Sequence, residues 1–453
     1  MKQAQYRLLD RYKFCKDFTN FNKNQLIALV LIFIGCCWYF SSSYTFNVQK
    51  SRKINEELKR FKALLKQNSK ANSSSCKVPQ LDPWDVSILK YYKEAPALTC
   101  TPIQANVTYV ENGYLKINKE FIGNVQCRYR YYGQDTGISD YEVRYEEWRD
   151  FESEAKIEQD FVEVECSRKS FLSVNFYKYH WNTIVPKITN LINKSIENSS
   201  NEKPSVIMMG IDSMSRSNFI RQLNKTYAVL QKLGFVDMKS HVKIWDNTYN
   251  NLLAVLLGKR GTPSREFPAE IPDSPEIYYD GFDFIWKNFS DQGYVTLLAE
   301  DKPDRGTFNK DYNTKGFKFQ PVDHYMRPYW LAAVSSLLKL RSVLKCYDYN
   351  PEFTLHLNYI QQFLNNYKNK RKFAFWWTQD LSHDDLNKFG VFDHDLAKFF
   401  ETNAPNFEDS IVIVFSDHGD RIHAIRQTVV GRLESRYINT RGHLHHLCLL
   451  TRV

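Results

Sequence analysis

Acidic residues and histidines follow four short apolar runs in the second half of the chain. The runs read VIMMGID, VTLLAED, FAFWWTQD and IVIVFSDH, and the residues concerned are Asp212, Glu300 with Asp301, Asp380 with His383, and Asp417 with His418. One such run could end in an ordinary solvated loop, but four parallel strands would bring these side chains to one edge of a sheet. Clustered carboxylates repel one another, so the pattern predicts a bound cation. Mixed Asp and His ligands suit zinc or manganese better than calcium.

Thr248 is a candidate nucleophile in the string DNTYNNLLAVLLG. It precedes a Leu-rich stretch and should lie at a helix N-terminus, where free N–H groups and the helix dipole favour an anionic oxygen and an incoming anion. A threonine hydroxyl also needs a metal ion or a base to ionise at neutral pH. The alternative is that Thr248 or Asn247 only caps the helix.

The elements that must position these residues alternate along the chain. Amphipathic stretches, such as residues 216–234 and 351–369, separate the four apolar runs. Near-continuous apolar strands separated by helices indicate a parallel sheet that is covered on both faces. The second half of the chain is therefore predicted to be an α/β domain.

The composition excludes a disordered chain and gives no support to nucleic-acid binding. Of the 453 residues, 43% are hydrophobic and 15% are aromatic, which is ample for a large core. The 61 Lys and Arg residues exceed the 51 Asp and Glu residues by ten, but acidic residues are interspersed throughout. No nucleic-acid partner is expected.

The N-terminal region predicts a membrane anchor. Residues 26–46 carry no charge and are long enough to cross a bilayer, and a basic segment, residues 1–25, precedes them. A cleaved signal peptide is the alternative, but the polar segment is long and no clear cleavage site follows the apolar run. We expect a single-pass type II membrane protein of the Golgi, the secretory pathway or the cell surface, with residues 1–25 in the cytosol.

Sequons and cysteines place the body in the lumen or outside the cell. Six Asn-X-Ser/Thr triplets follow the anchor, at Asn72, Asn106, Asn193, Asn198, Asn224 and Asn288, and are predicted to carry N-glycans at some positions. Four cysteines fall in one stretch after it, at Cys76, Cys100, Cys127 and Cys166. Their spacing is not that of a zinc site, so disulfides are expected, with three pairings open.

The chain divides into six predicted parts. These are a cytosolic tail (1–25), the transmembrane anchor (26–46), a stem with a short helix (47–75), a cystine-containing β-rich module (76–200), the α/β domain (201–437) and an atypical tail (438–453). The last segment, INTRGHLHHLCLLTRV, shows neither strand nor helix periodicity, and its three histidines are read as incidental.

Several of these strings together resemble the DUF229 family of membrane-anchored animal proteins. They are MGIDSMSR, DNTYNNLLAVLLG, AEDKP, PVDHYMRP, WTQDLSHDDLN and SDHGDR, in order over about residues 76–437. That family is placed in the alkaline phosphatase-like, sulfatase-like superfamily, which implies a doubly wound α/β/α sandwich. The family also continues past the segment equivalent to GRLESRY, so the α/β domain is expected to be truncated at its C-terminus.

The resemblance also implies roles for five residues. Asp212, Asp417 and His418 match metal ligands of the superfamily, with zinc the first choice and manganese or calcium the alternatives. Thr248 matches the nucleophile, which is also a metal ligand. His383 resembles the histidine that helps to bind substrate or a second metal in phosphoethanolamine transferases and lipoteichoic acid synthases. The formylglycine motif of ordinary sulfatases, C/S-x-P-x-R, is absent at Thr248.

Two functions are compatible with these features. The first is a metal-dependent hydrolase or transferase that acts on phosphate or sulfate esters through Thr248, with His383 as proton donor or as support for a second metal. The second is a catalytically inactive glycosylated surface protein that uses the fold as a binding platform. A purely structural matrix glycoprotein is disfavoured, because such a protein has no need for ligand chemistry at four strand ends.

Overall fold

The structure is a computed structural model that describes residues 79–169, 174–186, 203–272, 274, 276–309, 314–436 and 440–444, together with Glu56 and Lys59. The chain forms two compact units, residues 1–79 and 80–453, and the architecture below belongs to the second. The predicted tail, anchor and most of the stem lie outside the described residues, as do Asn72, Cys76, Asn193 and Asn198. Within the described ranges, no helix is long and apolar enough to span a membrane.

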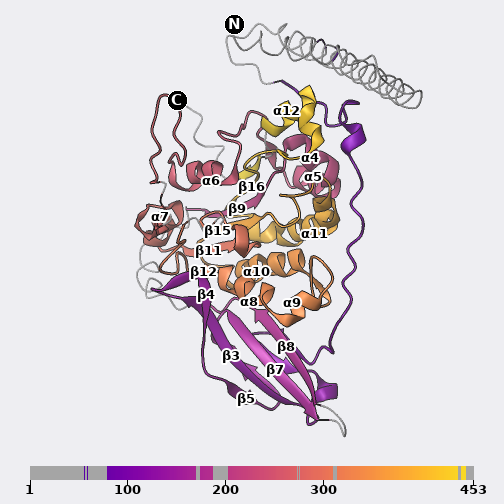
Figure 1. The fold of residues 1–453 in the computed structure, drawn as a ribbon, viewed down its shortest axis with the longest axis vertical. Helices are drawn as coiled ribbons and strands as arrows, with labels where there is room; N and C mark the ends of the chain where they lie inside the picture. The colour runs from indigo at the N-terminus through magenta and orange to yellow at the C-terminus, as the bar shows by residue number, and fades with distance from the viewer. Residues whose placement is uncertain are drawn as a thin grey trace, which may run out of the picture. The chain divides into compact units, whose positions relative to one another are not determined.

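A seven-stranded sheet forms the centre of the α/β part (Figure 1). Its order is β10 (Val236–Asp237), β17 (Thr440–Leu444), β16 (Ser410–Phe415), β9 (Ser205–Ile211), β15 (Lys372–Thr378), β11 (Val295–Glu300) and β12 (His324–Tyr325). The five strands from β16 to β12 are parallel, whereas β17 pairs antiparallel with β16 and β10 pairs antiparallel with β17. All four predicted parallel strands are present, as β9, β11, β15 and β16.

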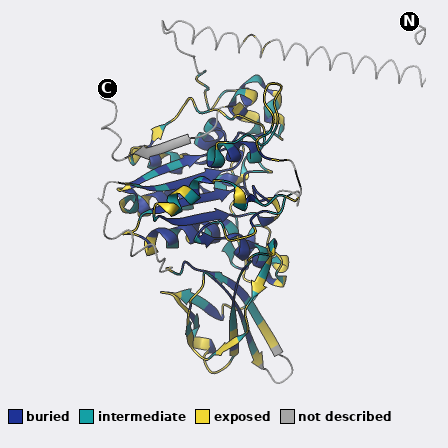
Figure 2. Cartoon of the chain, turned by 90° about the vertical axis from the view of Figure 1, so that its left-hand side faces the viewer, coloured by how far each residue is buried: buried dark blue, intermediate teal, exposed yellow. Residues whose placement is uncertain are grey.

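The central strands are mostly apolar and buried because both faces of the sheet are covered (Figure 2). Every residue of β11 and β15 is buried. Along β15, Ala374 and Trp376 enter one hydrophobic cluster, whereas Phe373, Phe375 and Trp377 enter a second. This alternation is that of a strand between two helical layers.

The helices form those two layers (Figure 1). Their bounds are α4 Arg216–Gln222, α5 Asn224–Lys232, α6 Thr248–Leu257, α7 Ile285–Asp291, α8 Arg327–Val334, α9 Leu337–Arg341, α10 Glu352–Asn366, α11 Asp393–Asn403 and α12 Val429–Arg436. Side chains of α6 and α7 pack in the second cluster, and those of α5, α8, α10 and α11 in the first. Short 3-10 helices occur at Leu89–Tyr91, Lys119–Phe121, Tyr279–Gly281, Pro303–Arg305, Lys388–Phe392, Ala404–Phe407 and Ala424–Gln427. The predicted single helix over residues 216–234 is two helices, because Leu223 leaves the helical conformation.

A group of antiparallel strands, all within residues 108–182, precedes the α/β part. The larger sheet has the order β4 (Ser139–Tyr145), β3 (Gln126–Asp135), β7 (Phe161–Lys169) and β8 (Val174–Asn182), and β5 (Arg149–Phe151) also pairs with β3. A smaller sheet contains β1 (Thr108–Glu111), β2 (Tyr114–Ile117) and β6 (Glu154–Lys156). Within the α/β part, β13 (Cys346–Tyr347) pairs with β14 (Asn350–Pro351).

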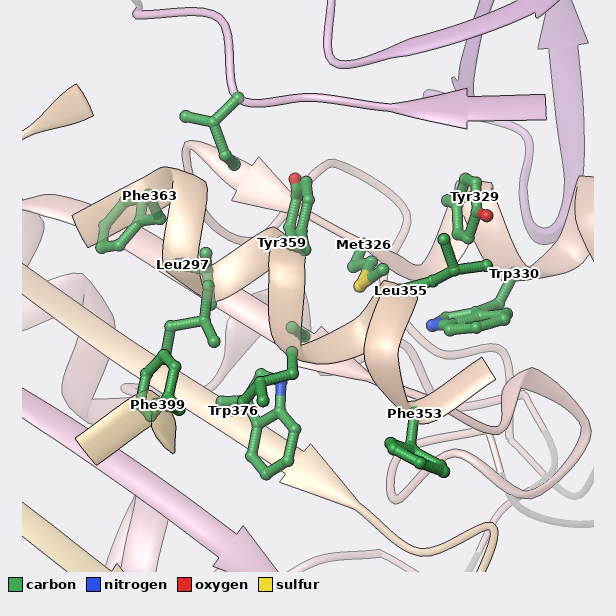
Figure 3. Packing of buried hydrophobic residues seen from close by; sticks show 14 of the residues in the cluster. Leu297, Met326, Tyr329, Trp330, Phe353, Leu355, Tyr359, Phe363, Trp376 and Phe399 are labelled. Atoms are coloured by element: carbon green, nitrogen blue, oxygen red, sulfur yellow. The ribbon is translucent and has the colours of Figure 1, made fainter. Parts of the chain in front are cut away.

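The β-rich segment and the α/β part share one hydrophobic core. Phe161 of β7 packs against Tyr329 of α8 and Tyr359 of α10, with ring centroids 6.1 and 6.0 Å apart. On its other side α10 faces the central sheet, where Trp376 of β15 belongs to the same cluster (Figure 3). Residues from both predicted parts therefore bury one another within the unit that begins at Gln80.

The disulfides correct the expected pairing. Cys127 of β3 bonds to Cys166 of β7, one of the open possibilities, but Cys100 bonds to Cys346, which lies far along the chain in β13. The sequence argument considered only the four clustered cysteines, and a partner 246 residues away gives no local signal. This second bond ties the β-rich segment covalently to the α/β part.

The expectation of an irregular tail from residue 438 is wrong for Thr440–Leu444. These residues form β17, which pairs antiparallel with both β16 and β10. Backbone hydrogen bonds join β17 to its two neighbouring strands, and these bonds do not depend on side-chain type. A strand can therefore form beside β16 without an alternating apolar pattern in its sequence. The chain thereby covers an edge of β16 that would otherwise be open.

Candidate active site

Two neighbouring parallel strands carry the acidic residues of the site to the same level. Gly210 of β9 is paired with Phe415 of β16, and both strands end within one residue of this pair. Continuing the register by two residues places Asp212 beside Asp417. Both therefore lie at the carboxyl edge, where the chain order reverses around β9 and where open α/β sheets bind their ligands.

Asp212, Asp417 and His418 form a compact buried cluster. Each offers one ligand atom, and these atoms lie within 4.8 Å of one another; the three residues are 0%, 2% and 0% exposed. Asp212 Oδ1 accepts a hydrogen bond from Ser213 Oγ at 2.9 Å, and Asp417 Oδ1 accepts from the backbone N–H groups of Ser213 at 3.2 Å and His418 at 2.8 Å. Burial, followed by repulsion from Asp417, raises the pKa of Asp212 well above its usual value.

Two carboxylate oxygens in this cluster lack donors. Asp212 Oδ2 and Asp417 Oδ2 are buried and accept no hydrogen bond from the described part of the chain. His418 Nε2 lies 3.2 Å from Asp417 Oδ2, but this short contact does not have hydrogen-bond geometry. Buried carboxylate oxygens without donors are costly unless a cation satisfies them.

The tautomer of His418 explains why its Nε2 does not donate a hydrogen bond to Asp417 Oδ2. The Nδ1 atom lies 2.9 Å from the carbonyl oxygen of Gly419, which can only accept, so Nδ1 carries the proton. Burial lowers the pKa of His418 and favours the neutral ring. The Nε2 lone pair therefore faces Asp212 Oδ1 at 3.7 Å and Asp417 Oδ2 at 3.2 Å.

The ligand atoms of this cluster fit a divalent cation. Two carboxylate oxygens and one neutral imidazole nitrogen, all with free lone pairs, lie within 4.8 Å of one another. His418 also has the backbone partner on Nδ1 that is usual for a ligating histidine. The predicted ligands Asp212, Asp417 and His418 thus come together from two strand ends. Their assignment as ligands, and the preference for zinc, remain predictions.

Thr248 lies beside the cluster at the start of α6. Its Oγ1 is 3.5 Å from Asp212 Oδ1 and 3.4 Å from His418 Nε2. Asn247 is the N-cap, and its side chain accepts from the Asn250 N–H at 3.1 Å. The capping alternative therefore applies to Asn247, and the Thr248 hydroxyl remains directed at the cluster from the first helical residue.

The backbone next to Asp212 is strained. Ser213 has a φ of 59°, in the left-handed region that non-glycine residues seldom adopt. This conformation lets the Ser213 N–H reach Asp417 Oδ1 while its hydroxyl reaches Asp212 Oδ1. Such strain is characteristic of functional sites, where the surrounding structure holds it in place.

A cavity of 210 Å³ opens onto Thr248. Arg305, Thr307, Gln379, His383 and Arg421 also line it. Arg305 and Arg421 place two cationic residues in the lining of a cavity that also contains a hydroxyl at a helix N-terminus. Both features attract a tetrahedral oxyanion. Sequence reasoning missed both arginines, although Arg421 stands in SDHGDR only three residues after His418.

His383 shares this cavity but is held by its neighbours. Its Nδ1 lies 2.6 Å from Asp384 Oδ1, and its Nε2 accepts from the Arg421 guanidinium at 2.9 Å. Arg305 contacts Asp384 in turn, with its Nη1 3.3 Å from a carboxylate oxygen. In this arrangement His383 orients Arg421, and it could give a proton to a leaving group only after Arg421 moves.

The other acidic strand ends do not join the cluster of Asp212, Asp417 and His418. Asp301 accepts from Thr378 Oγ1 at 2.6 Å and from the Gln379 N–H at 3.0 Å, and burial raises its pKa to about 7. Glu300 accepts from Thr307 Oγ1 at 2.7 Å. Asp380 pairs with Lys345 at 2.6 Å. These carboxylates hold loops in place, so the expected four-strand cluster is a two-strand cluster.

Comparisons with solved structures return proteins of one superfamily at low similarity. A protein of the alkaline phosphatase superfamily from Vibrio parahaemolyticus is 16% identical, with a TM-score of 0.38, and the match covers 53% of this chain and 60% of that one. A lipoteichoic acid synthase from Listeria monocytogenes is 15% identical, with a TM-score of 0.36, 53% of this chain and 66% of that one covered. A putative sulfatase from Bacteroides fragilis is 12% identical, with a TM-score of 0.34 and coverages of 55% and 69%.

The match with the first of these structures spans about 60% of that protein's length. A comparison with curated protein sequences gave no significant match. In the family comparison, residues 93–438 match the profile described as "Protein of unknown function (DUF229)". That match covers well over half of the sequence, and the chain therefore belongs to the DUF229 family.

Proposed function

We propose that this protein is a metal-dependent hydrolase or transferase of phosphate or sulfate esters, with Thr248 as the nucleophile. The observation that carries the proposal is the position of Thr248 Oγ1, 3.5 and 3.4 Å from two atoms of a buried cluster with unsatisfied carboxylate oxygens. The same hydroxyl opens onto a cavity with two arginines. A hydroxyl between a cation site and an oxyanion site is suited to attack on an anionic ester.

Asp212, Asp417, His418 and Thr248 Oγ1 would hold the cation. When bound, a divalent ion supplies positive charge that favours ionisation of the Thr248 hydroxyl and offsets the charge of the ester. Zinc is the first choice for two carboxylates and an imidazole, with manganese or calcium as alternatives. Arg305 and Arg421 would bind the non-bridging oxygens and fix the ester in front of Oγ1.

The reaction takes two displacements. Thr248 Oγ1 gives its proton to solvent and forms a bond to phosphorus or sulfur. The bond to the leaving oxygen breaks, and that oxygen keeps the electron pair and takes a proton from solvent. Water or an acceptor alcohol then attacks the same centre, the bond to Oγ1 breaks, and Thr248 recovers its proton. Hydrolysis and transfer differ only in the second nucleophile.

The predicted location is part of the proposal. We infer a type II membrane protein anchored by residues 26–46, with its body in the lumen of the secretory pathway or outside the cell. The two disulfides support an oxidising compartment. The three described sequons, at Asn106, Asn224 and Asn288, have exposed asparagines that could carry N-glycans.

Activity measurements on the full chain test the function. The metal-stripped protein would be assayed with aryl phosphate monoesters, aryl phosphodiesters and aryl sulfates after addition of zinc, manganese or calcium. We expect metal-dependent turnover of at least one ester class. Thr248→Ala should abolish it, whereas Thr248→Ser should retain part of it because the hydroxyl remains.

Thr136→Ala is the matched control, since Thr136 is an exposed threonine in the turn after β3 and lines neither the cavity nor the cluster. It should leave turnover unchanged. Equal turnover by the wild type and Thr248→Ala would refute the nucleophile. If no ester class is turned over with any metal, the catalytic proposal fails and the binding-platform function remains.

A further inference from the structure

A second, larger cavity lies next to the candidate active site. Its volume is 680 Å³, within the range of cavities that bind small molecules. Six charged side chains in its lining dominate its chemistry, namely Lys243, Asp246, Arg421, Arg426, Arg432 and Arg436. Five are cationic and one is a carboxylate, so this set carries a formal charge of +4.

The single carboxylate among them is already shared. Asp246 Oδ1 lies 2.6 Å from Lys243 Nζ, and its Oδ2 accepts from Arg426 at 2.9 Å. The hydrogen bond from Lys243 and the one from Arg426 lower the pKa of Asp246 to about 2. The lining thus contains no further carboxylate for Arg421, Arg432 or Arg436.

Contacts with the backbone hold three of the arginines in place. Arg421 donates to the carbonyl oxygen of Asp246 at 3.4 Å, Arg426 donates to that of Arg421 at 3.3 Å, and the Arg432 Nε–H donates to that of Arg426 at 3.2 Å. Each guanidinium has five N–H donors, so these bonds fix its position and leave donors for a ligand. Arg436 lies four residues after Arg432 on α12, on the same helical face.

Arg421 connects this basic cavity to the candidate active site. It lines both cavities, and its guanidinium also donates to His383 Nε2 at 2.9 Å. A molecule whose ester group lies before Thr248 can therefore extend past Arg421 into the larger cavity. The arginines there would meet whatever that molecule carries beyond its ester.

We propose that the basic cavity binds a second anionic group of the same substrate, so that the substrate is a polyanion that carries a sulfate, phosphate or carboxylate besides the ester that reacts. This inference rests on the proposed function. It adds that Arg426, Arg432 and Arg436 select the substrate by charge. Bidentate contacts between guanidinium groups and oxyanions provide that selection.

Binding to a chain that cannot turn the substrate over tests this directly. A trisulfated heparin disaccharide would be titrated calorimetrically into Thr248→Ala, and into Thr248→Ala with Arg432→Gln and Arg436→Gln added. Both arginines are exposed on α12, so their replacement should leave the fold intact. We expect the affinity to fall by about 10- to 100-fold, as for the loss of two hydrogen bonds of ordinary net strength at exposed side chains.

The matched control is Arg144→Gln with Arg168→Gln in the same background. It also removes two positive charges from exposed residues, but on β4 and β7, and neither residue lines a cavity described above. The control should bind like its parent. Equal affinity in all three proteins, or equal losses in both double variants, would overturn the proposal.

Two further measurements are needed. One distinguishes a free anion from an anionic group of the substrate, and the other distinguishes failure of this proposal from failure of the proposed function. Inorganic sulfate would be titrated into the same proteins. If Arg432→Gln with Arg436→Gln weakens the binding of sulfate as much as that of the disaccharide, the cavity holds a free anion, and it does not bind a second anionic group of the substrate. If no ester is turned over but the disaccharide result holds, the anion site stands and the proposed function fails. Turnover with no loss of disaccharide affinity would refute the anion site alone.

Discussion

Replacing Asp212 by asparagine should stabilise the metal-free protein and remove its response to metal. The ligand atoms of Asp212 and Asp417 lie within 4.8 Å of each other. At an effective dielectric constant of about 20, two unit charges at that separation repel by about 3 kcal/mol. The pKa of Asp212 is raised, so part of the wild-type population is already protonated and free of this repulsion. The full repulsion is therefore an upper value for the stability that Asp212→Asn can add.

The geometry allows the amide to fit. Asp212 Oδ1 accepts from Ser213, and the asparagine oxygen can take this position, while Asp212 Oδ2 has no described donor. The new NH2 group would replace that second oxygen and could donate to Asp417 Oδ2, which also lacks a donor in the described structure.

Urea unfolding with a chelator and with zinc measures the effect. We expect Asp212→Asn to raise the free energy of unfolding by about 1–3 kcal/mol in the chelator. The wild type should gain about 3 kcal/mol from zinc at a hundred times its dissociation constant, and the variant should gain little.

Asp301→Asn is the control, because both oxygens of this buried carboxylate accept hydrogen bonds and a new NH2 group would face donors. It should destabilise the protein by about 1–3 kcal/mol with or without metal. Our account of the cluster is refuted if Asp212→Asn behaves like Asp301→Asn and zinc does not stabilise the wild type.

Three other changes should affect stability. Replacing Cys100 and Cys346 by serine opens a loop of 246 residues and should cost up to about 5 kcal/mol, measured by urea unfolding, whereas an unchanged midpoint would contradict the bond. Burial lowers the pKa of His356 to about 3, so its contribution to stability is full above pH 6.5 and is lost as the pH falls toward 3. His356→Gln keeps a donor for the Trp377 carbonyl oxygen but removes the titrating group. Between pH 6.5 and 3 it should therefore reduce the slope of the unfolding free energy against pH by up to about 1.4 kcal/mol per pH unit. Gly419→Ala should lower stability by about 1–3 kcal/mol, since the added Cβ would lie 2.8 Å from Ser435 Cα in α12, and an unchanged melting temperature would contradict that packing.

The sequence was sufficient to predict the parallel strands and the positions of Asp212, Asp417 and His418, because both have local signatures. An unbroken run such as VIMMGI can be buried on two faces only in a covered sheet, and a polar residue directly after it must lie at the carboxyl edge. That reasoning located Asp212, Asp417 and His418, and the start of α6 located Thr248.

The same reasoning failed where hydrogen-bond partners decide a residue's role. Asp301 follows β11 as Asp212 follows β9, but Thr378 and the Gln379 N–H bind it, and no sequence pattern shows those donors. Arg305 and Arg421 reach the cavity from loops. The partner of Cys100 and the strand at Thr440–Leu444 are also set by tertiary pairing.

The most direct test of the central claim is to trap the group on Thr248. The metal-loaded full chain would be mixed with an aryl phosphate or aryl sulfate, quenched in acid, digested and examined by tandem mass spectrometry. We predict one phosphoryl or sulfuryl group on Thr248, absent from Thr248→Ala and from protein stripped of metal. Turnover with a modification on another residue, or with no trapped group under any quench, would contradict the assignment of Thr248 as the nucleophile.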